Sequence, residues 1–387
     1  MEILFWLSLV VVFYAFLGYG ILIYLLVLVK RQPHQQTKPG SVPFEPAVSL
    51  VIPCYNEAHI LKEKVQNCFQ LDYPSSLLQI YFITDGSTDG FREVLRDYPE
   101  IILLHEDQRG GKTAAENRAM LFIKTPIVVF SDANTMLNRQ AIQNIVRHFE
   151  DEKVGCVSGE KRVKVEEKDS ASSAGEGIYW KYESLLKRLD SEWHTAVGAA
   201  GELVAFRTDL YEVLPEDTIL DDFMQSMLIA AKGYKIVYEP EAYAVETGSA
   251  SIKEEMKRKI RISAGGWQSI QRLWNKITPA KDPSLYFQYI SHRVLRWTVT
   301  PFLLILLFLL NIFLWEVHWI YQALMIGQLV FYLAAVAGYL LENRSIRLKL
   351  FFVPFYFCMM NYAVILGLIR FLNNSQQGMW EKAARKS

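Results

Sequence analysis

Between residues 53 and 134, four short polar motifs each come just after a short apolar run. They are Pro53-Cys54-Tyr55-Asn56-Glu57, Asp85-Gly86-Ser87, Arg109-Gly110-Gly111-Lys112 and Ser131-Asp132-Ala133-Asn134. Side-chain oxygens such as those of Asp132 and Asn134 suit a hard divalent cation, and the ammonium of Lys112 suits a phosphate. Turns also favour Asp, Asn and Gly, so one motif alone is not specific. The four together predict a site for a nucleotide diphosphate and a metal.

Two adjacent carboxylates, Asp221 and Asp222, follow an apolar stretch and precede the helix-like residues 224–231. Transfer of a group to a hydroxyl needs a base that takes the proton. One of the two could simply cap the helix. We predict Asp222 as the base and Asp221 as the orienting or capping residue.

Phosphate-binding loops of the common kinds are not present. Gly111-Lys112-Thr113 resembles the end of a P-loop, but the pattern needs glycine at position 106, where the chain has Glu106. The chain also has no GxGxxG motif, so a dinucleotide site of that kind is not supported.

The motifs alternate with elements typical of an α/β fold. The apolar runs 48–52, 80–84, 101–104 and 127–130 have strand length, and helix-like stretches at 58–70, 113–123 and 139–149 follow three of them. This alternation predicts a mainly parallel sheet with helices on both faces. Ligands of such sheets bind beyond the carboxyl ends of the strands, where the four motifs lie.

Apolar residues gather at both ends of the chain. The chain has 387 residues, of which 51% are apolar, and 41 basic and 41 acidic residues leave no excess charge for a nucleic-acid partner. Residues 1–30 read as an uncleaved membrane anchor, because a basic leader and a small-residue cleavage site are missing. Residues 299–315, 318–341 and 350–372 are further stretches of spanning length. The predicted organisation is a membrane helix (1–30), a linker (31–46), a cytosolic catalytic domain (47–250), amphipathic or interfacial helices (251–298), about three transmembrane helices (299–372) and a polar tail (373–387).

Basic residues orient these stretches. Lys30, Arg31 and Lys38 follow the first helix, and the loop 342–349 is basic, so both are expected on the cytoplasmic side of a plasma (inner) membrane. Four spans would place the tail outside, although it carries Lys382, Arg385 and Lys386. Either the tail tolerates this, or one stretch is re-entrant or interfacial.

Residues 252–274 predict a basic amphipathic helix. It could lie on a membrane surface or form part of the core with one wet face, and neither interpretation is favoured. Its arginines, Arg258 and Arg261, could also face a pyrophosphate, because a planar donor fork suits that group.

In order and content, the motifs resemble the inverting family 2 glycosyltransferases with a GT-A, Rossmann-like fold. The likeness is greatest to the membrane-embedded branch that includes hyaluronan, cellulose and poly-N-acetylglucosamine synthases. It is carried by the motifs above together with those at 198–201, 220–222, 258–266 and 291–297.

The resemblance implies a role for each matching residue. The donor side would comprise Asn56, Glu57, Asp85, Lys112, Asp132, Arg258 and Arg261. The acceptor side would comprise Gly198, Gly201, Glu202 and Trp267. Asp132 and Asn134 would hold Mg²⁺ or Mn²⁺, and Asp222 with Asp221 would be catalytic in a single displacement with inversion.

Two departures from the family pattern shape the predicted function. The metal motif is Asp132-Ala133-Asn134 where the family usually has Asp-x-Asp, and a Gln-x-x-Arg-Trp motif is reduced to Arg261. The second loss disfavours chain elongation. We therefore predict a membrane-bound enzyme that moves a sugar from a nucleotide-sugar, with UDP favoured, to a lipid-linked or polysaccharide acceptor. The alternatives are a processive polysaccharide synthase that secretes its product and a non-catalytic nucleotide-sugar-binding membrane subunit.

Overall fold

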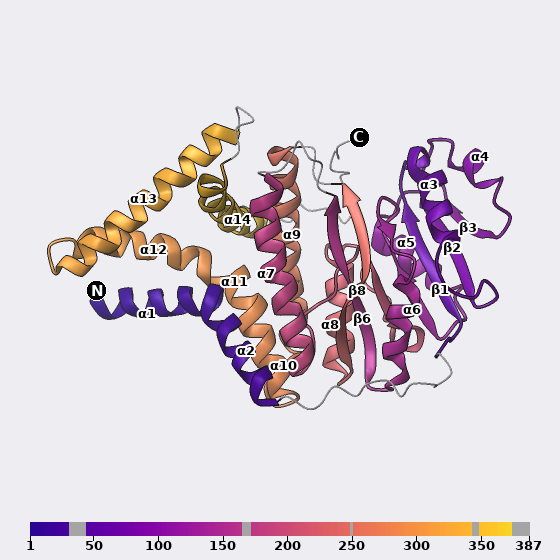
Figure 1. Ribbon diagram of the computed structural model, residues 1–387, viewed down its shortest axis with the longest axis horizontal. Helices are drawn as coiled ribbons and strands as arrows, with labels where there is room; N and C mark the ends of the chain where they lie inside the picture. Colours follow the sequence, from indigo (N-terminus) through magenta and orange to yellow (C-terminus); the bar gives the residue numbers. More distant parts are fainter. Residues whose placement is uncertain (31–43, 165–171, 248–250, 343–347, 374–387) are drawn as a thin grey trace.

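A mixed sheet lies at the centre of residues 44–273, which contain the predicted site and are called the catalytic half below. The computed structural model describes residues 1–30, 44–164, 172–247, 251–342 and 348–373. Within them the strand order is β3-β2-β1-β4-β7-β6-β8-β5 (Figure 1). The bounds are β1 Val48–Cys54, β2 Leu78–Asp85, β3 Ile101–Glu106, β4 Ile127–Phe130, β5 Met136–Leu137, β6 Val154–Lys164, β7 Val204–Arg207 and β8 Lys235–Thr247.

The half of the sheet that carries the predicted motifs is parallel. β3, β2, β1 and β4 pair in parallel, and each contains one of the four predicted strands. Beyond β4 the sheet is mixed, because β7 runs antiparallel to both β4 and β6, whereas β8 is parallel to β6. The predicted fold class is confirmed. The antiparallel strand β7 was not predicted from the sequence.

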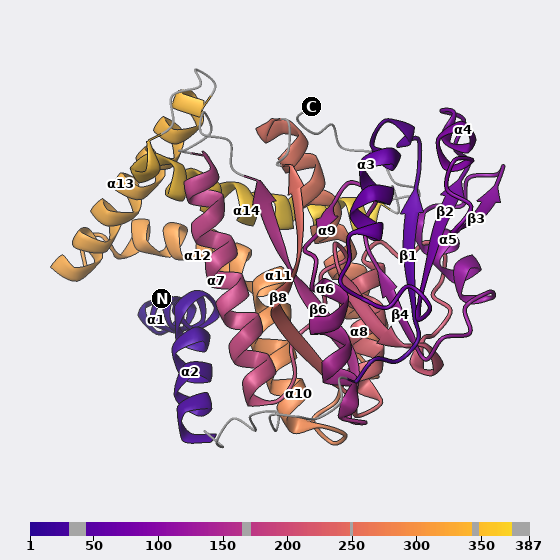
Figure 2. The ribbon, with the colours of Figure 1, turned by 45° about the vertical axis from the view of Figure 1, so that its right-hand side comes forward.

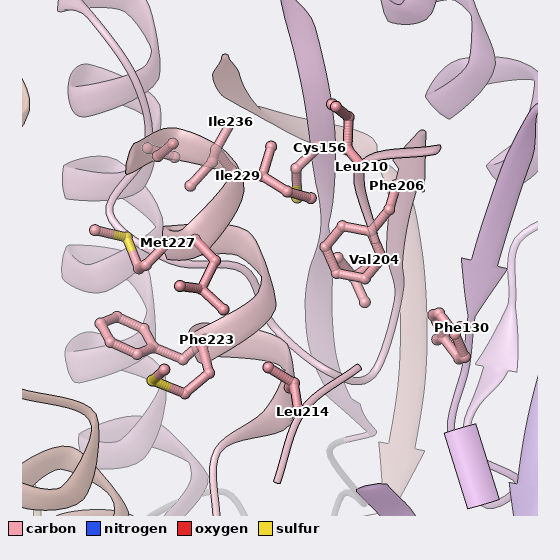
Figure 3. Close-up of a cluster of buried hydrophobic side chains, with 14 of the residues drawn as sticks. Phe130, Cys156, Val204, Phe206, Leu210, Leu214, Phe223, Met227, Ile229 and Ile236 are labelled. Carbon is pink, nitrogen blue, oxygen red and sulfur yellow. The ribbon is translucent and has the colours of Figure 1, made fainter. Parts of the chain in front are cut away.

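Helices cover both faces of the sheet, as predicted. Leu50 and Ile52 of β1 join a core with α3 (Ala58–Phe69) and α6 (Ala141–Val146), whereas Val51 joins the core on the other face. This division follows from the two-residue period of a strand. The second core lies under α5 (Lys112–Met120) and α8 (Asp221–Ala231), and Figure 3 shows its aromatic and aliphatic side chains between α8 and the sheet.

The apolar ends of the chain form a helical layer beside the sheet (Figure 1). The first helix consists of α1 (Glu2–Phe13), a π-helical turn (Tyr14–Gly18) and α2 (Tyr19–Lys30). Glu2–Lys30, Trp319–Glu342 and Leu350–Leu372 are long and apolar enough to cross a membrane, and Pro283–Trp297 with Val299–Leu314 forms a pair bent by 54° that could be a fourth. The last three helices are α12 (Val299–Leu314), α13 (Trp319–Glu342) and α14 (Lys349–Leu372). Of the predicted linker only 44–46, and of the predicted tail only Asn373, lie among the described residues.

The predicted amphipathic helix is α9 (Ile252–Leu273). Ser251 caps its first turn by accepting a hydrogen bond from the Glu254 backbone N–H at 3.3 Å. The helix packs against α8 on one side and α14 on the other, and it buries the side chains of Glu255 and Lys259. Its apolar face is therefore covered by protein.

A buried polar network joins the first helix to the catalytic half. Asp190 of α7 (Ser172–Trp193) is fully buried and accepts hydrogen bonds from the Tyr19 hydroxyl and, at 3.1 Å, from the Gln288 side chain. Nδ1 of His292 lies 2.6 Å from the other Asp190 oxygen. Gln288 belongs to α10 (Pro283–Tyr289) and His292 to the π-helical turn Ile290–Val294, which leads into α11 (Leu295–Trp297). One turn of α7 thus holds two segments that are distant in sequence.

Loss of the Tyr19 hydroxyl should weaken this junction. Tyr19→Phe removes one donor from a buried carboxylate, so we expect the free energy of unfolding to fall by about 1–2 kcal/mol. Tyr24→Phe is the matched control, because Tyr24 lies on the same helix and is half exposed. Denaturant unfolding of the detergent-solubilised protein measures both. Equal stability of the two variants would contradict the role of the Tyr19–Asp190 contact.

Candidate active site

The Lys112 ammonium is surrounded by carboxylates at the carboxyl end of the parallel strands. Its Nζ lies 2.8 Å from Asp132 Oδ1, 3.6 Å from Asp221 Oδ2 and 3.7 Å from Glu116 Oε1. Lys112 is the first residue of α5, and its N-cap residue, Gly111, has a φ of 97°, which glycine adopts without strain. These carboxylates hold the pKa of Lys112 well above its usual range despite burial. The ion group brings together residues that are up to 109 positions apart.

The acidic pair, Asp221 and Asp222, lies at the start of α8, beside Lys112. The helix begins at Asp221 with Leu220 as its N-cap, and no side chain caps it. The expected start at residue 224 is therefore wrong, and Asp221 lies in the first turn instead of capping the helix. Both carboxylates gain from the positive end of the helix dipole. Asp222 additionally accepts a hydrogen bond from the Phe223 backbone N–H at 2.7 Å.

The environments of the two carboxyls push their pKa values apart. Burial raises the pKa of Asp222 to about 7, and the negative charge of Asp221 adds to this shift. Burial acts on Asp221 too, but Lys112 and a hydrogen bond with Glu116 hold the pKa of Asp221 below its ordinary value. Asp222 is thus poised to exchange a proton near neutral pH, whereas Asp221 stays ionised.

Glu116 belongs to this group and was missed by the sequence analysis. It is buried on α5, and burial together with the charge of Asp221 raises the pKa of its carboxyl well above the ordinary value. The raised pKa favours the protonated form of Glu116, which donates a hydrogen bond to Asp221. A glutamate inside a predicted helix reads as a solvated side chain, so the sequence held no signal for this role.

A small pocket opens onto these carboxyls. Its polar lining comes from Lys112, Glu116, Asp221 and Asp222, together with Gln225 of α8. Its apolar lining comes from both sheet and loop, namely Phe130, Val204, Phe206 and Tyr211, with Gly201 at the rim. An apolar wall behind charged groups lowers the local dielectric and strengthens their interactions.

Asp85 ends β2 and fixes the loop that leads to Lys112. Its Oδ2 accepts hydrogen bonds from the backbone N–H groups of Gly110 at 3.0 Å and Gly111 at 2.7 Å. Its Oδ1 lies 3.4 Å from Nη1 of Arg118, a second residue that the sequence analysis missed. Asp85 thus positions the start of α5, which adds to the donor role predicted for it.

Asn56 and Glu57 lie beyond the end of β1, next to the loop that follows Asp85. The Asn56 side chain accepts from the Thr88 N–H at 3.0 Å, and the Asn56 backbone N–H donates to the Ser87 hydroxyl at 3.1 Å. Glu57 is the N-cap residue of α3 but makes no side-chain cap. The structure thus brings these donor-side residues to the sheet edge that also carries Asp85 and Asp132.

Lys64 forms hydrogen bonds with the loop that carries Asp132 and Asn134. This lysine is fully buried and donates to the Ser131 hydroxyl at 2.9 Å and to the Thr135 carbonyl at 2.7 Å. Among the described residues no three His, Cys, Asp or Glu side chains cluster as a ready metal site. One carboxylate and one amide oxygen nevertheless fit a cation such as Mg²⁺, which commonly takes its other ligands from substrate phosphates and water.

On the predicted acceptor side, the glycines lie against the acidic pair. A Cβ at Gly201 would be 2.9 Å from Asp222 Oδ2, and one at Gly198 would be 2.3 Å from the Phe223 ring. Gly198 also has a φ of 86°. Both positions therefore need glycine for the backbone to approach the start of α8 this closely.

The other predicted acceptor residues are Glu202 and Trp267, and the charge of Glu202 acts on Asp222. Glu202 accepts a hydrogen bond from buried Lys161 at 2.6 Å. The indole N–H of Trp267 is buried without a partner among the described residues. Trp297, the last residue of the motif at 291–297, was not assigned to the acceptor side, but its ring centroid lies 5.2 Å from that of Phe223, next to Asp222.

The two arginines predicted on the donor side lie in different charged groups. Arg261 is near enough for its charge to act on Asp221, Asp132 and Asp222. Arg258 instead forms an ion pair with Glu255 at 3.1 Å and belongs to the neighbouring charged cluster around Lys161 and Glu202. Of the two, Arg261 lies with the carboxylate group.

Known proteins resemble the chain both in sequence and in structure. It is 26% identical over 187 residues to Beta-monoglucosyldiacylglycerol synthase of Nostoc sp., covering 46% of this chain and 38% of the relative. It is 24% identical over 250 residues to Poly-beta-1,6-N-acetyl-D-glucosamine synthase of Staphylococcus aureus, covering 62% of this chain and 59% of the relative. The matches thus span less than two thirds of either relative.

A solved structure shares the fold along nearly the whole chain. The mannosyltransferase PcManGT from Pyrobaculum calidifontis, in complex with GDP-Man and Mn²⁺, superposes with a TM-score of 0.73 at 22% identity, over 96% of this chain and 99% of that one. The likeness includes the helices at both ends as well as the sheet. The family model described as Glycosyl transferase family 2 matches residues 49–214. The chain therefore carries a glycosyl transferase family 2 domain, as its motifs predicted.

Proposed function

We propose that the protein is a membrane-bound inverting glycosyltransferase. It moves a sugar from a nucleotide-sugar, with UDP favoured, to a hydroxyl of a lipid-linked or polysaccharide acceptor. The observation that carries the proposal is that two neighbouring carboxyls with different pKa values line one pocket. Asp222 has a pKa of about 7, and Asp221 stays ionised beside Lys112.

The reaction is a single displacement in which Asp222 is the base. The acceptor oxygen attacks the anomeric carbon as Asp222 takes the hydroxyl proton, and the bond from that carbon to the diphosphate oxygen breaks. The new glycosidic bond forms on the opposite face of the sugar, so the configuration inverts. Asp221 holds the start of α8 through Lys112 and thereby orients Asp222.

The nucleoside diphosphate leaves with its negative charge. Lys112 and Arg261 supply positive charge on this side of the pocket. A divalent cation, Mg²⁺ or Mn²⁺, held by Asp132 and Asn134 would neutralise the departing diphosphate. Asn56, Glu57 and Asp85 lie at the adjoining strand ends and would hold the nucleoside end of the donor.

Addition of one or a few sugars is favoured over secretion of a long polymer. Asn311 and Asn361 are the main polar residues of the apolar stretches. Asn311 is buried and donates to Gln328 of α13 at 2.9 Å, and Asn361 donates to the Phe357 carbonyl of its own helix at 2.9 Å. Both amides are thus engaged within the helical layer, which offers little polar lining for a glycan path.

The location and partners follow from the same features. The catalytic domain is placed on the cytosolic side of a plasma (inner) membrane, where nucleotide-sugars are available, with a multi-pass anchor in the bilayer. A glycolipid product agrees with the diacylglycerol in one relative's name, and a glycan acceptor agrees with the other relative's name. No nucleic-acid partner is proposed, because the formal net charge is zero.

Release of nucleotide from a donor panel tests the proposal. We expect Mg²⁺- or Mn²⁺-dependent release from one donor among UDP-sugars and GDP-mannose, with diacylglycerol or a lipid-linked saccharide as acceptor. Asp222→Asn should lower turnover by about 10³-fold or more while donor binding persists, because the base is lost. Asp209→Asn, an exposed aspartate in the same domain, is the matched control. Donor binding without turnover for the wild type would favour the non-catalytic subunit.

The pH dependence of turnover tests Asp222 as the base. Only the ionised carboxylate accepts a proton, so kcat/KM should fall about tenfold per pH unit below pH 7 and level off above about pH 8. The measurement is kcat/KM for nucleotide release between about pH 5 and 9, which reports the free enzyme. A midpoint near 4, as for an ordinary aspartate, would exclude the raised pKa.

Substitution of Glu116 tests its role beside Asp221. Glu116→Gln keeps a hydrogen-bond donor and no charge, so kcat/KM should stay within about threefold of wild type. Glu116→Leu removes the donor, which makes Asp221 harder to ionise, and should lower kcat/KM about tenfold or more. The acid midpoint of the pH profile should also move down, because Asp222 then feels less negative charge. If Gln and Leu behave alike, Glu116 only fills space.

A further inference from the structure

Helix α14 passes the length and hydropathy test for a membrane span, but it differs from the other candidates in its packing. Of its most apolar stretch 39% is buried inside the protein, against 17% for Glu2–Lys30 and 17% for Trp319–Glu342. It packs against α9 and α7 of the catalytic half as well as against α12 and α13. It therefore lies between the domain and the apolar layer.

The contact of α14 with α9 is close enough to involve the two backbones. A Cβ at Gly367 would be 2.5 Å from Ser263 Cβ and 2.8 Å from the Ala264 backbone nitrogen. Nearer the start of α14, Phe352, Phe355, Tyr356 and Met359 form a buried cluster against Ile252 and Met256 of α9. These contacts fix α14 along α9 over most of its length.

The outer face of α14 is apolar. Its exposed side chains are Leu350, Val353, Tyr362, Ile369 and Leu372. Between Leu350 and Leu372, where the structure describes the side chains, no charged residue is exposed. A helix with one face on a folded domain and an uncharged, apolar opposite face is suited to the boundary between headgroups and acyl chains.

The direction of α14 differs from that of the other apolar helices. In Figure 1, α1 and α12 run side by side away from the sheet and α13 returns, whereas α14 is seen nearly end-on. Figure 2, turned by 45°, shows α14 lengthwise beside the catalytic half. The axis of α14 therefore runs in a different direction from the axes of α1 and α12.

The start of α1 and the turn between α12 and α13 have the features of a membrane surface on the side opposite to the catalytic half. The Tyr321 hydroxyl donates to Glu2 Oε2 at 2.7 Å and accepts from the Trp6 indole at 3.0 Å. Trp315 and Trp319, both exposed, flank the turn between α12 and α13. Aromatic residues gather at membrane surfaces in this way. The residues at this end include no lysine or arginine.

We propose that α14 does not cross the bilayer but lies along its surface on the side of the catalytic domain. With α14 crossing, the segment after it would carry Lys382, Arg385 and Lys386 to the outer side. With α14 on the surface, every basic residue that flanks an apolar stretch stays on the catalytic side, as the charge rule for membrane proteins requires. These are Lys30, Arg31, Lys38, Arg293, Arg296, Arg344, Arg347, Lys349, Lys382, Arg385 and Lys386, together with Arg370 near the end of α14.

This position brings the catalytic pocket to the lipid headgroups. Helix α9 lies between α14 and the segment that precedes the acidic pair, because α9 packs against α14 and its Gly265 lies against Ile219 and Leu220, with a Cβ there 2.8 Å from Ile219 Cγ2 and 2.6 Å from Leu220 Cγ. The thickness of one helix is about 10–12 Å. An acceptor whose hydroxyl lies at the headgroup level can then reach Asp222 without leaving the membrane. The inference rests on the proposed membrane location and narrows the acceptor to a lipid.

Cysteine labelling in spheroplasts that produce the full chain tests the topology without measuring activity. A membrane-impermeant maleimide should label Val317→Cys in intact spheroplasts, but Ser387→Cys and Lys38→Cys only after permeabilisation. The unsubstituted chain gives the background of its four native cysteines. Labelling of Ser387→Cys in intact spheroplasts would overturn the proposal, as would protection of Val317→Cys.

The yield of membrane-inserted protein for two lysine variants provides a second test. Val330 and Tyr362 are exposed residues near the middle of α13 and α14, respectively. Val330→Lys should lower the yield of membrane-inserted protein at least about tenfold, because a charge at the centre of a span is costly. Tyr362→Lys should leave the yield within about twofold, since its ammonium reaches the headgroups. Equal losses would show that α14 spans. If the labelling pattern and the yields are as expected but the protein transfers no sugar, the proposed function is contradicted and the position of α14 is not.

Discussion

The site depends on one buried cation, Lys112, and the carboxylates around it. Asp132 follows β4, Asp221 begins α8 and Glu116 lies one turn along α5, so a single ammonium joins three elements. Three acids, Glu116, Asp221 and Asp222, line one pocket and cannot all ionise at so short a distance from each other. The cation lowers the pKa of Asp221, the pKa of Glu116 is raised well above its ordinary value, and Asp222 acquires a pKa near neutrality. The fold thereby produces a proton acceptor from an ordinary aspartate.

The backbone around this group is arranged so that the carboxylates can approach each other. Asp85 uses its carboxylate to hold the Gly110 and Gly111 amides, and buried Lys64 holds the loop of Asp132. Gly201 leaves the space that Asp222 occupies. These hydrogen bonds fix the backbone that carries the charged side chains. A departing diphosphate would therefore meet positive charge that is already in position, with little rearrangement.

A second buried network makes the catalytic half and the apolar helices one structure. Asp190 binds Tyr19 and His292, and Glu183 lies 2.6 Å from Arg296. Ion pairs of this kind, shielded from water, are costly to break because a charge would be left without a partner. Through α9, α14 and this network, the apolar helices hold a fixed position relative to the pocket.

Strand periodicity and turn chemistry are local, so the fold class, the strand ends with their motifs and the likeness to family 2 glycosyltransferases could be predicted from the sequence. The predicted strands at 48–52, 80–84, 101–104 and 127–130 all lie within the observed strands. Tertiary structure decided the rest. It placed Glu116 and Lys64 in the interior, separated Arg258 from Arg261 and laid α14 along α9. A buried charge and a solvated charge read alike in one sequence, since burial depends on residues far along the chain. An apolar stretch likewise gives its length but not its direction.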